Sequence, residues 1–350
     1  MSYNGFEIFY QNLGNADSIY VRHWTNSVPT NILIDGGRKA HVDQIEEFLE
    51  ERSKDTPECS STVHHLVCTH SDDDHAGGLV PLVENEEFHI EQAWVHDLRG
   101  TEFLPSGYRD SLRRWGANRL LEKIESSEQT RIALLEALET RNISCKDPFA
   151  GAQIGPIWVL GPTVEFFKAQ YSQLIQEESA KSFETLLESR QIEQLYFSEE
   201  MVKQADAAKD LGDGATTPIN EVSTILLLPG RDETSGHYVF TGDVGPQGID
   251  EVIDRFGTLL KPTRWLDVPH HGSRRSMRKD QIDHFSPATS FISAKGSVKH
   301  PSRKLVNALK QHGKVFSTHY SVAEGSWLRH KTGDVPALST SPATALYDKN

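Results

Sequence analysis

The chain has 350 residues, of which 37% are hydrophobic and 25% are charged, and this composition indicates a globular protein rather than a disordered or fibrous one. Its formal net charge of −14 argues against a protein that coats polyanions along its whole surface. Three cysteines are too few for a disulfide framework or a zinc-finger pattern. No stretch has the length and hydropathy of a membrane span and the N-terminus carries no secretory signal, so we expect a cytoplasmic protein without membrane contact.

Strand-like and helix-like patterns alternate along the chain. Strands are expected at residues 6–10, 18–24, 30–37, 62–70, 91–97, 154–163, 223–230, 237–243, 263–273, 289–294 and 314–318. Helices are expected at residues 41–52 and 302–312, and the strands at 223–230 and 237–243 are expected to form a hairpin. Two charged stretches at about 107–143 and 164–210 have helical spacing, which predicts helical insertions in a single α/β domain over residues 1–350.

Potential metal ligands follow three of these predicted strands. The stretch LVCTHSDDDHAGGL, residues 66–79, places two histidines and three aspartates within six positions, directly after an apolar run. TGD places Asp243 after a second strand, and DVPHHGS places His270 and His271 after a third. Imidazoles and carboxylates that converge from several strand ends are typical of hydrolytic metal sites, in which coordination positions stay open to water. The sequence therefore predicts a metal site at one sheet edge.

These stretches also resemble a known family. THSDDDHAGGL resembles the first metal motif of the metallo-β-lactamase superfamily, His-x-His-x-Asp-His, with Asp72 where the second histidine stands. With LGNADS, NILIDGG, YVFTGD, VPHHGS and KHPS, this form resembles the hydrolase domain of DNA-uptake competence proteins of the ComEC type, in the family's order from about residue 6 to residue 302. The resemblance implies an αβ/βα sandwich: two mixed sheets, helices outside, and metals at the sheet edge. The two predicted helical insertions match no part of that family's pattern.

The resemblance implies the ligands of two divalent ions, Zn²⁺ or Mn²⁺: His70 and Asp72 for the first, Asp74 and His75 for the second, and Asp243 bridging both. VPHHG aligns with a superfamily stretch that makes His271 a ligand of the second ion and His270 its neighbour, and the opposite assignment stays open. Where the superfamily has a third histidine for the first ion, this chain has Asn220. An amide oxygen binds metal more weakly than imidazole, and Asp72 is a harder ligand, so the first ion is expected to be loosely held, or to be Mn²⁺ or Mg²⁺.

Other residues near these stretches are given further roles. Asp35 of LIDGG is expected to hydrogen-bond the metal-binding loop, and Asp73 is expected to be solvated. His300 of KHPS has either a substrate or proton-transfer role or a structural role at the start of a helix. The candidates for a direct catalytic role are Asp74, His270 and His300. His64 and His65 are expected to be structural, and His96 and His319 have no assigned role.

Two ions about 3.5–4 Å apart can bridge one water and make it hydroxide, so the site predicts a hydrolase without naming its substrate. A phosphodiester is favoured because Asp72 suits a phosphate-handling metal and because residues 255–314 carry 13 of the 36 lysines and arginines against three aspartates. The expected partner is thus nucleic acid or another phosphodiester. The residues predicted to bind its phosphates follow the histidine pair: Arg274, Arg275, Arg278 and Lys279.

Two other functions remain open. The first is a small-molecule hydrolase that acts on a lactone, an ester or a nucleotide, with the helical insertions as a lid; the net charge of −14 favours it. The second is a binding module that keeps the fold without metal, for which Asn220 is the only indication.

Overall fold

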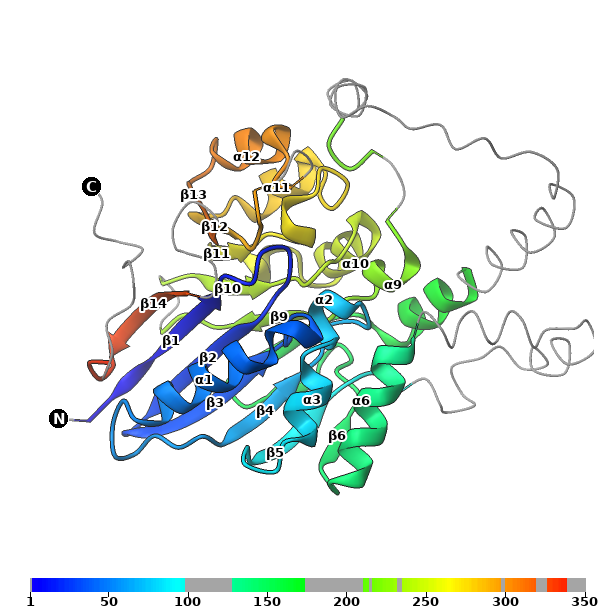
Figure 1. Ribbon diagram of the computed structural model, residues 1–350. Helices are drawn as coiled ribbons and strands as arrows, with labels where there is room; N and C mark the ends of the chain where they lie inside the picture. The colour runs from blue at the N-terminus through cyan, green and yellow to red at the C-terminus, as the bar shows by residue number, and fades with distance from the viewer. Residues whose placement is uncertain are drawn as a thin grey trace, which may run out of the picture.

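The computed structural model describes residues 2–97, 128–173, 210–213, 216–231, 235–296, 300–318 and 326–338. They form two seven-stranded sheets that pack face to face, with helices on both outer faces (Figure 1). Each sheet contains both parallel and antiparallel pairs, so the predicted α/β sandwich of two mixed sheets is confirmed. The single domain over residues 1–350 stays a prediction, because part of that range lies outside the described residues.

The first sheet has the order β14-β1-β2-β3-β4-β5-β6. Pairing is antiparallel from β14 to β3 and parallel from β3 to β6, so β3, β4 and β5 bring their carboxyl ends to the same edge. The strands are β1 (Asn4–Gln11), β2 (Ile19–Thr25), β3 (Val28–Ile34), β4 (Val63–Val67), β5 (Ile90–Trp94), β6 (Ser144–Lys146) and β14 (Trp327–Asp334).

The second sheet has the order β13-β12-β11-β10-β9-β8-β7. Its strands β10 to β13 are parallel, and β9 and β10 are the antiparallel pair that the sequence predicts. The strands are β7 (Gln153–Ile154), β8 (Ile157–Gly161), β9 (Ile225–Leu228), β10 (His237–Phe240), β11 (Thr263–Asp267), β12 (Thr289–Ile292) and β13 (Lys314–Ser317). The ILLL run of β9 is buried throughout, as expected for a strand covered on both faces.

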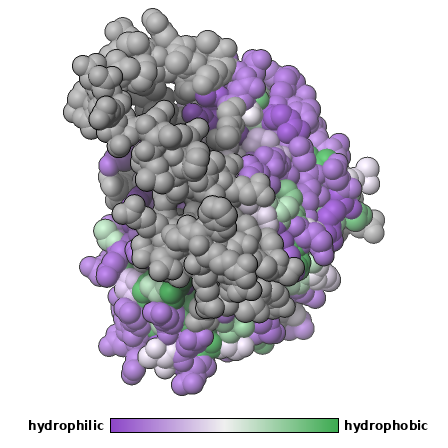
Figure 2. Space-filling view, turned by 90° about the vertical axis from the view of Figure 1, so that its right-hand side faces the viewer, coloured by the Kyte–Doolittle hydropathy of each residue, from purple (hydrophilic) through white to green (hydrophobic). Residues whose placement is uncertain are grey.

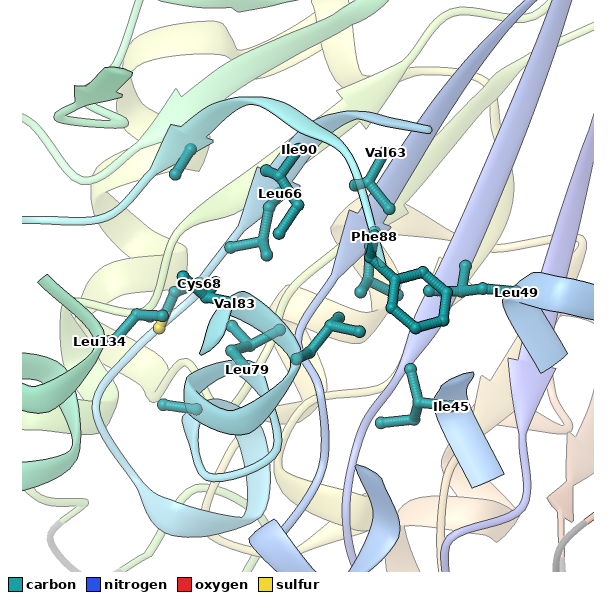
Figure 3. Packing of buried hydrophobic residues seen from close by; sticks show 14 of the residues in the cluster. Ile45, Leu49, Val63, Leu66, Cys68, Leu79, Val83, Phe88, Ile90 and Leu134 are labelled. Atoms are coloured by element: carbon teal, nitrogen blue, oxygen red, sulfur yellow. The ribbon is translucent and has the colours of Figure 1, made fainter. Parts of the chain in front are cut away.

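Apolar side chains fill three layers. The middle layer lies between the sheets and joins residues of β1 and β2 to residues of β9, β10 and β11. Helices α1 (Val42–Ser53), α3 (Leu79–Glu84) and α6 (Gln129–Thr140) cover the first sheet, where Leu66, Leu79 and Leu134 lie in one buried cluster (Figure 3). Helices α10 (Pro246–Phe256), α11 (Lys279–Phe285) and α12 (Arg303–Leu309) cover the second sheet. Two one-turn helices, α2 (Asp73–Ala76) and α9 (Pro218–Glu221), lie near the predicted metal site.

Only parts of the two predicted helical insertions are described. In the first, about 107–143, residues 107–127 lie outside the described residues and α6 is helical as expected. In the second, residues 164–173 are helical and residues 174–209 lie outside the described residues. The structure adds β6, β14, α10 and α11, which the sequence patterns do not predict.

The described surface offers little exposed apolar area. Three large hydrophobic side chains are exposed, those of Val28, Trp158 and Leu259, and they are far apart in the sequence. One face, seen from the side of α6 and α10, is mostly hydrophilic where the described residues form it (Figure 2). None of the described helices combines the length and the apolar character that crossing a membrane requires.

Candidate metal centre

The loops after β4, β10 and β11 meet at one edge of the two sheets. Backbone hydrogen bonds connect them: Thr224 N–H donates to the carbonyl of Thr69 at 2.9 Å, and His270 N–H donates to the carbonyl of Gly242 at 3.2 Å. The first contact ties β9 to the loop that carries His70, and the second ties the loop after β11 to the loop that carries Asp243. Residues up to 200 positions apart in the sequence therefore come together because parallel strands end at the same edge.

The carboxylate of Asp243 lies at the centre of this cluster. One oxygen, Oδ1, is 3.1 Å from Nε2 of His75, and the other, Oδ2, is 4.0 Å from Nε2 of His70 and 3.8 Å from Nδ1 of His270. Burial raises the pKa of Asp243, but the imidazoles of His75, His270 and His271 outweigh it and hold the pKa well below its usual range. The carboxylate therefore stays ionised and faces both predicted metal positions, which is the geometry that a bridging ligand needs.

Three histidines hold their rings in the same way. Nδ1 of His75 donates to the carboxylate of Asp35 at 2.8 Å, and Nδ1 of His271 donates to the carbonyl of Ser293 at 3.0 Å. Nδ1 of His70 is 3.0 Å from the hydroxyl of Thr69, whose own proton is donated to Asp35. Because each Nδ1 is occupied as a donor, the lone pair of the neutral ring lies on Nε2, the arrangement found in metal-binding histidines. Asp35 thus contacts the loop as predicted.

In the second predicted site, His271 lies beside Asp74, and His75 lies beside Asp243. Nε2 of His271 is 3.5 Å from Oδ2 of Asp74, and Nε2 of His75 faces Asp243. Burial lowers the pKa of His271, yet Asp243, Asp17 and Asp74 raise it to about 9, and the pKa of His75 is raised well above its ordinary value by Asp243 and Asp35. A cation would have to replace the protons on both rings, so metal binding here is coupled to proton release.

The first predicted site is less complete. Nε2 of His70 is 3.6 Å from Oδ2 of Asp72, which is partly exposed. The Oδ1 atom of Asn220 accepts a hydrogen bond from the Thr217 hydroxyl at 2.7 Å, and its Nδ2 atom donates to Nδ1 of His270 at 3.1 Å. Both polar atoms of this amide are thus engaged by neighbouring side chains, which agrees with a first site that holds metal more weakly than the second.

Several of the buried polar atoms without hydrogen bonds lie together at this centre. Within the described part of the chain, no hydrogen-bond partner is present for Nε2 of His70, His75 and His271 or for Oδ1 of Asp17 and Asp243; the 3.1 Å approach of His75 to Asp243 lacks hydrogen-bond geometry. Each such buried atom costs about 1–3 kcal/mol when it is left unsatisfied. Two sets of three donor atoms lie within 4.8 Å of one another: His70, His75 and Asp243, and Asp17, Asp243 and His271. Each set fits a divalent cation, but the sets differ from the predicted ligand sets, because His75 groups with His70 and Asp17 groups with His271.

Asp17 is a member of this cluster that the sequence patterns do not identify. It lies just before β2, and its backbone N–H donates to the carbonyl of Asp74 at 3.1 Å. Its Oδ1 is 3.7 Å from Nδ1 of His271 and its Oδ2 is 3.9 Å from Nδ1 of His75. Burial raises its pKa. Its stretch LGNADS belongs to the family resemblance, which is the only signal for it in the sequence.

His270 and His271 both lie in the left-handed region of backbone conformation. His270 and His271 both have positive φ angles, 54° and 52°, followed by Gly272 at 75°. A Cβ atom on Gly272 would lie 2.8 Å from Cβ of Pro301, so this position requires glycine. The turn directs His271 into the buried cluster, while His270 keeps 31% of its side chain exposed and stacks on His300 with 5.6 Å between ring centroids. His270 and His300 thus form the open side of the site.

The basic residues after the histidine pair have different surroundings. Arg274 is buried and donates to the carbonyl of Asp213 at 2.6 Å. Arg278 pairs with Asp250 at 2.7 Å and with Asp280 at 3.0 Å, and Lys279 pairs with Asp283 at 2.7 Å. Arg275 is exposed. Of the four predicted phosphate-binding residues, Arg275 is therefore the one best placed to meet a substrate.

A further arginine lies beside the second site. The guanidinium of Arg38 is 2.9 Å from Oδ2 of Asp74 and 3.4 Å from Oδ2 of Asp73, and about half of its side chain is exposed. Asp73 is itself exposed, as predicted.

Three other histidines named from the sequence lie away from the cluster. His64 accepts a hydrogen bond from the Asn31 N–H at 3.0 Å, and His65 packs on Trp94. His96 is buried against Phe149 and Phe167, and its pKa is lowered well below its ordinary value by burial and by Arg131. His319 lies outside the described residues.

Comparison with known proteins gives one partial similarity. No family model matches the chain. A stretch of 96 residues is 34% identical to ComE operon protein 3 of Bacillus subtilis (strain 168). The stretch covers 27% of this chain and only 12% of that relative, so the chain is similar to a small part of a much longer protein.

Proposed function

We propose that this protein is a metal-dependent hydrolase of the metallo-β-lactamase superfamily and that it cleaves phosphodiesters, with nucleic acid as the substrate class. The observation that carries the proposal is the set of histidine Nε2 atoms and aspartate oxygens that are buried together without hydrogen bonds. Such a set is expensive to bury unless a ligand satisfies it, and its chemistry is that of a divalent cation site.

Each of the predicted ligands then has a defined task. His70 and Asp72 would hold the first ion, Asp74, His75 and His271 the second, and Asp243 would reach both. A pair of divalent ions supplies an activated water and polarises the bond under attack. Asp35, Thr69 and Ser293 fix the three imidazole rings from behind, so the ligand atoms are already aimed before any ion arrives.

His270 and His300 carry the exposed side of the site. They stack at the opening, and Nδ1 of His270 accepts a hydrogen bond from Asn220. This leaves Nε2 of His270 to exchange a proton with a leaving group or to bind a substrate oxygen. His270 would thus bind or protonate substrate without being needed to hold an ion.

The resemblance to the hydrolase domain of ComEC-type DNA-uptake proteins supports a phosphodiester substrate, and the partial similarity to ComE operon protein 3 agrees with that resemblance. The test is an assay of the purified chain with Mn²⁺, Mg²⁺ or Zn²⁺ against single- and double-stranded DNA, RNA and bis-p-nitrophenyl phosphate. We expect metal-dependent cleavage of at least one nucleic acid, and its loss in Asp74→Ala. Absence of cleavage of every phosphodiester with every metal would contradict the proposal.

A second candidate is a small-molecule hydrolase. It is favoured by the intramolecular ion pairs of Arg278 and Lys279 and by the burial of Arg274. These contacts reduce the positive charge that is available to bind a polymer. Hydrolysis of lactones or simple esters by a chain that leaves all nucleic acids intact would support this candidate instead.

A further inference from the structure

The loop that carries the first predicted site is hydrogen-bonded to a buried residue from outside the family pattern. Ser71 stands between His70 and Asp72, and its hydroxyl donates to Oε1 of Glu128 at 3.1 Å. Ser71 is 1% exposed and Glu128 is 3% exposed, so this contact is closed to solvent. Glu128 is the residue immediately before α6, within the first predicted helical insertion.

The second insertion reaches the same carboxylate. Tyr171, in the helical residues 164–173, donates its hydroxyl to Oε1 of Glu128 at 2.8 Å. Nε of Arg131, one turn into α6, is 3.0 Å from Oε2 of Glu128, and its guanidinium lies 5.8 Å from the centre of the Tyr171 ring. Arg131 and Tyr171 are both buried. Both helical segments therefore contribute side chains to one buried network. This network contacts the metal-binding loop through Ser71.

The same helical segment also packs against the other element of the first site. Phe167 and Tyr171 share a buried apolar cluster with Ile219 and Val222, which flank Asn220 on and just after α9. The two elements of the first site thus both rest on the helical insertions. The second-site ligands have further supports of their own, since His75 donates to Asp35 and His271 donates to Ser293, although α2, which carries Asp74 and His75, also contacts α6.

We propose that the buried Ser71–Glu128 hydrogen bond is a positioning contact, through which the first helical insertion holds the His70–Asp72 loop in the geometry that binds the first ion. The inference rests on the proposed metal centre and deepens it, because it gives the first insertion a task that the family pattern does not contain. Glu128 and Ser71 act through His70 and Asp72 and touch neither the ion nor the substrate. The first ion depends on this contact, and the second does not.

Two hydroxyl donors to one oxygen provide a matched pair of variants. Ser71→Ala removes the bond between the loop and Glu128, whereas Tyr171→Phe removes the bond from the second insertion and leaves the loop attached. Metal titration of the full chain by calorimetry, together with the visible absorption spectrum of the Co²⁺-loaded protein, measures the two sites. We expect Ser71→Ala to weaken the first ion about tenfold, the scale of one buried hydrogen bond, and to leave the second unchanged. Tyr171→Phe should lower the midpoint of thermal unfolding about as much as Ser71→Ala does, without changing the affinity for either ion.

A second pair covers the case in which Ser71→Ala does not fold. Glu128→Gln keeps an acceptor oxygen for Ser71 and should retain the first-site affinity within about twofold, whereas Glu128→Leu removes the acceptor and should weaken it as Ser71→Ala does. The inference is overturned if Ser71→Ala binds both ions like the parent, or if Tyr171→Phe weakens the first ion equally. A parent chain that binds no divalent ion would overturn the proposed metal centre itself, which is a separate result.

Discussion

The side-chain amide of Asn220 donates a hydrogen bond to Nδ1 of His270 at 3.1 Å. This contact joins Asn220, which stands where the resemblance predicts a third first-site histidine, to the histidine at the opening of the proposed site. The amide oxygen is also occupied, since it accepts from the Thr217 hydroxyl. The first site therefore has His70 as its only assigned imidazole, and a weaker hold on its ion follows from the geometry.

Restoring an imidazole at this position should strengthen the first site. Asn220→His is expected to tighten the first ion roughly tenfold, the scale on which changes around metal ligands act, because imidazole is a stronger ligand than an amide. Calorimetric titration with Zn²⁺ measures the change, and Asn220→Ala is the control that should show no gain. Equal affinities for Asn220→His and the parent would mean that position 220 does not face the first ion.

The two histidines of the pair should respond differently to removal. His271→Ala is expected to lose the second ion, because Nε2 of His271 lies 3.5 Å from Asp74 and has no hydrogen-bond partner among the described residues. His270→Ala should keep both ions and lose turnover. Metal content and kcat are the two measurements, and a His270→Ala protein that lacks one ion would reverse the assignment.

Among the basic residues after the pair, Arg275 should carry most of the effect on substrate binding. It is exposed, whereas Arg278 is paired with Asp250 and Asp280. Arg275→Glu is expected to raise KM for nucleic acid. It should also reduce the slope of log K against log salt concentration by roughly 0.9, the contribution of one phosphate contact on duplex DNA. Hydrolysis of bis-p-nitrophenyl phosphate is the internal control and should change little. If both substrates respond alike, Arg275 does not bind the polymer.

The buried His330 on the edge strand β14 should make the fold sensitive to acid. His330 lies on β14 against Trp265 and Tyr238, and burial together with Arg264 lowers its pKa from 6.5 to about 4. The unfolded chain therefore binds a proton that the folded chain does not, so stability is complete above about pH 6.5 and falls as the pH drops toward 4. The loss from this residue is about 3 kcal/mol.

His330→Gln tests this dependence because glutamine is buried there without a titrating group. Urea unfolding at pH 7 and pH 4.5 should show a smaller drop in unfolding free energy for the variant than for the parent. The same drop in both proteins would place the acid sensitivity elsewhere.

Most strands could be predicted because their side chains carry the pattern locally. The apolar runs that became β4, β9 and β11 read as strands in isolation. β14, with the sequence WLRHKTGD, lacks clear alternation of polar and apolar residues. It forms a strand because it pairs with β1, from the opposite end of the sequence, and because Arg329 forms an ion pair with Glu7. The helix α10 was missed because its first residues, Pro-Gln-Gly, resemble a turn.

The residues of the candidate site also divide into those that the sequence predicts and those that only the fold reveals. Ligands that follow a strand could be predicted, since the strand ends place them at one edge. Asp17 and Glu128 are single acidic residues in polar sequence, and their burial beside His271 and Ser71 arises only from tertiary packing. Arg278 is the opposite case, because its run of basic neighbours suggests a charge that is free to bind substrate. In the fold it forms an ion pair with Asp250, which comes from α10.

Elemental analysis of the purified chain beside Asp243→Ala tests the central claim most directly. Asp243 contacts both predicted positions, so its removal should eliminate tightly bound Zn²⁺ or Mn²⁺ while the circular dichroism spectrum stays that of the folded parent. Asp73→Ala is the matched control, because Asp73 is an exposed aspartate between the predicted ligands Asp72 and Asp74 and should retain the parent's metal content. The account predicts a metal-bearing parent and Asp73→Ala protein and a metal-free Asp243→Ala protein. An Asp243→Ala protein as metal-loaded as the parent would contradict it.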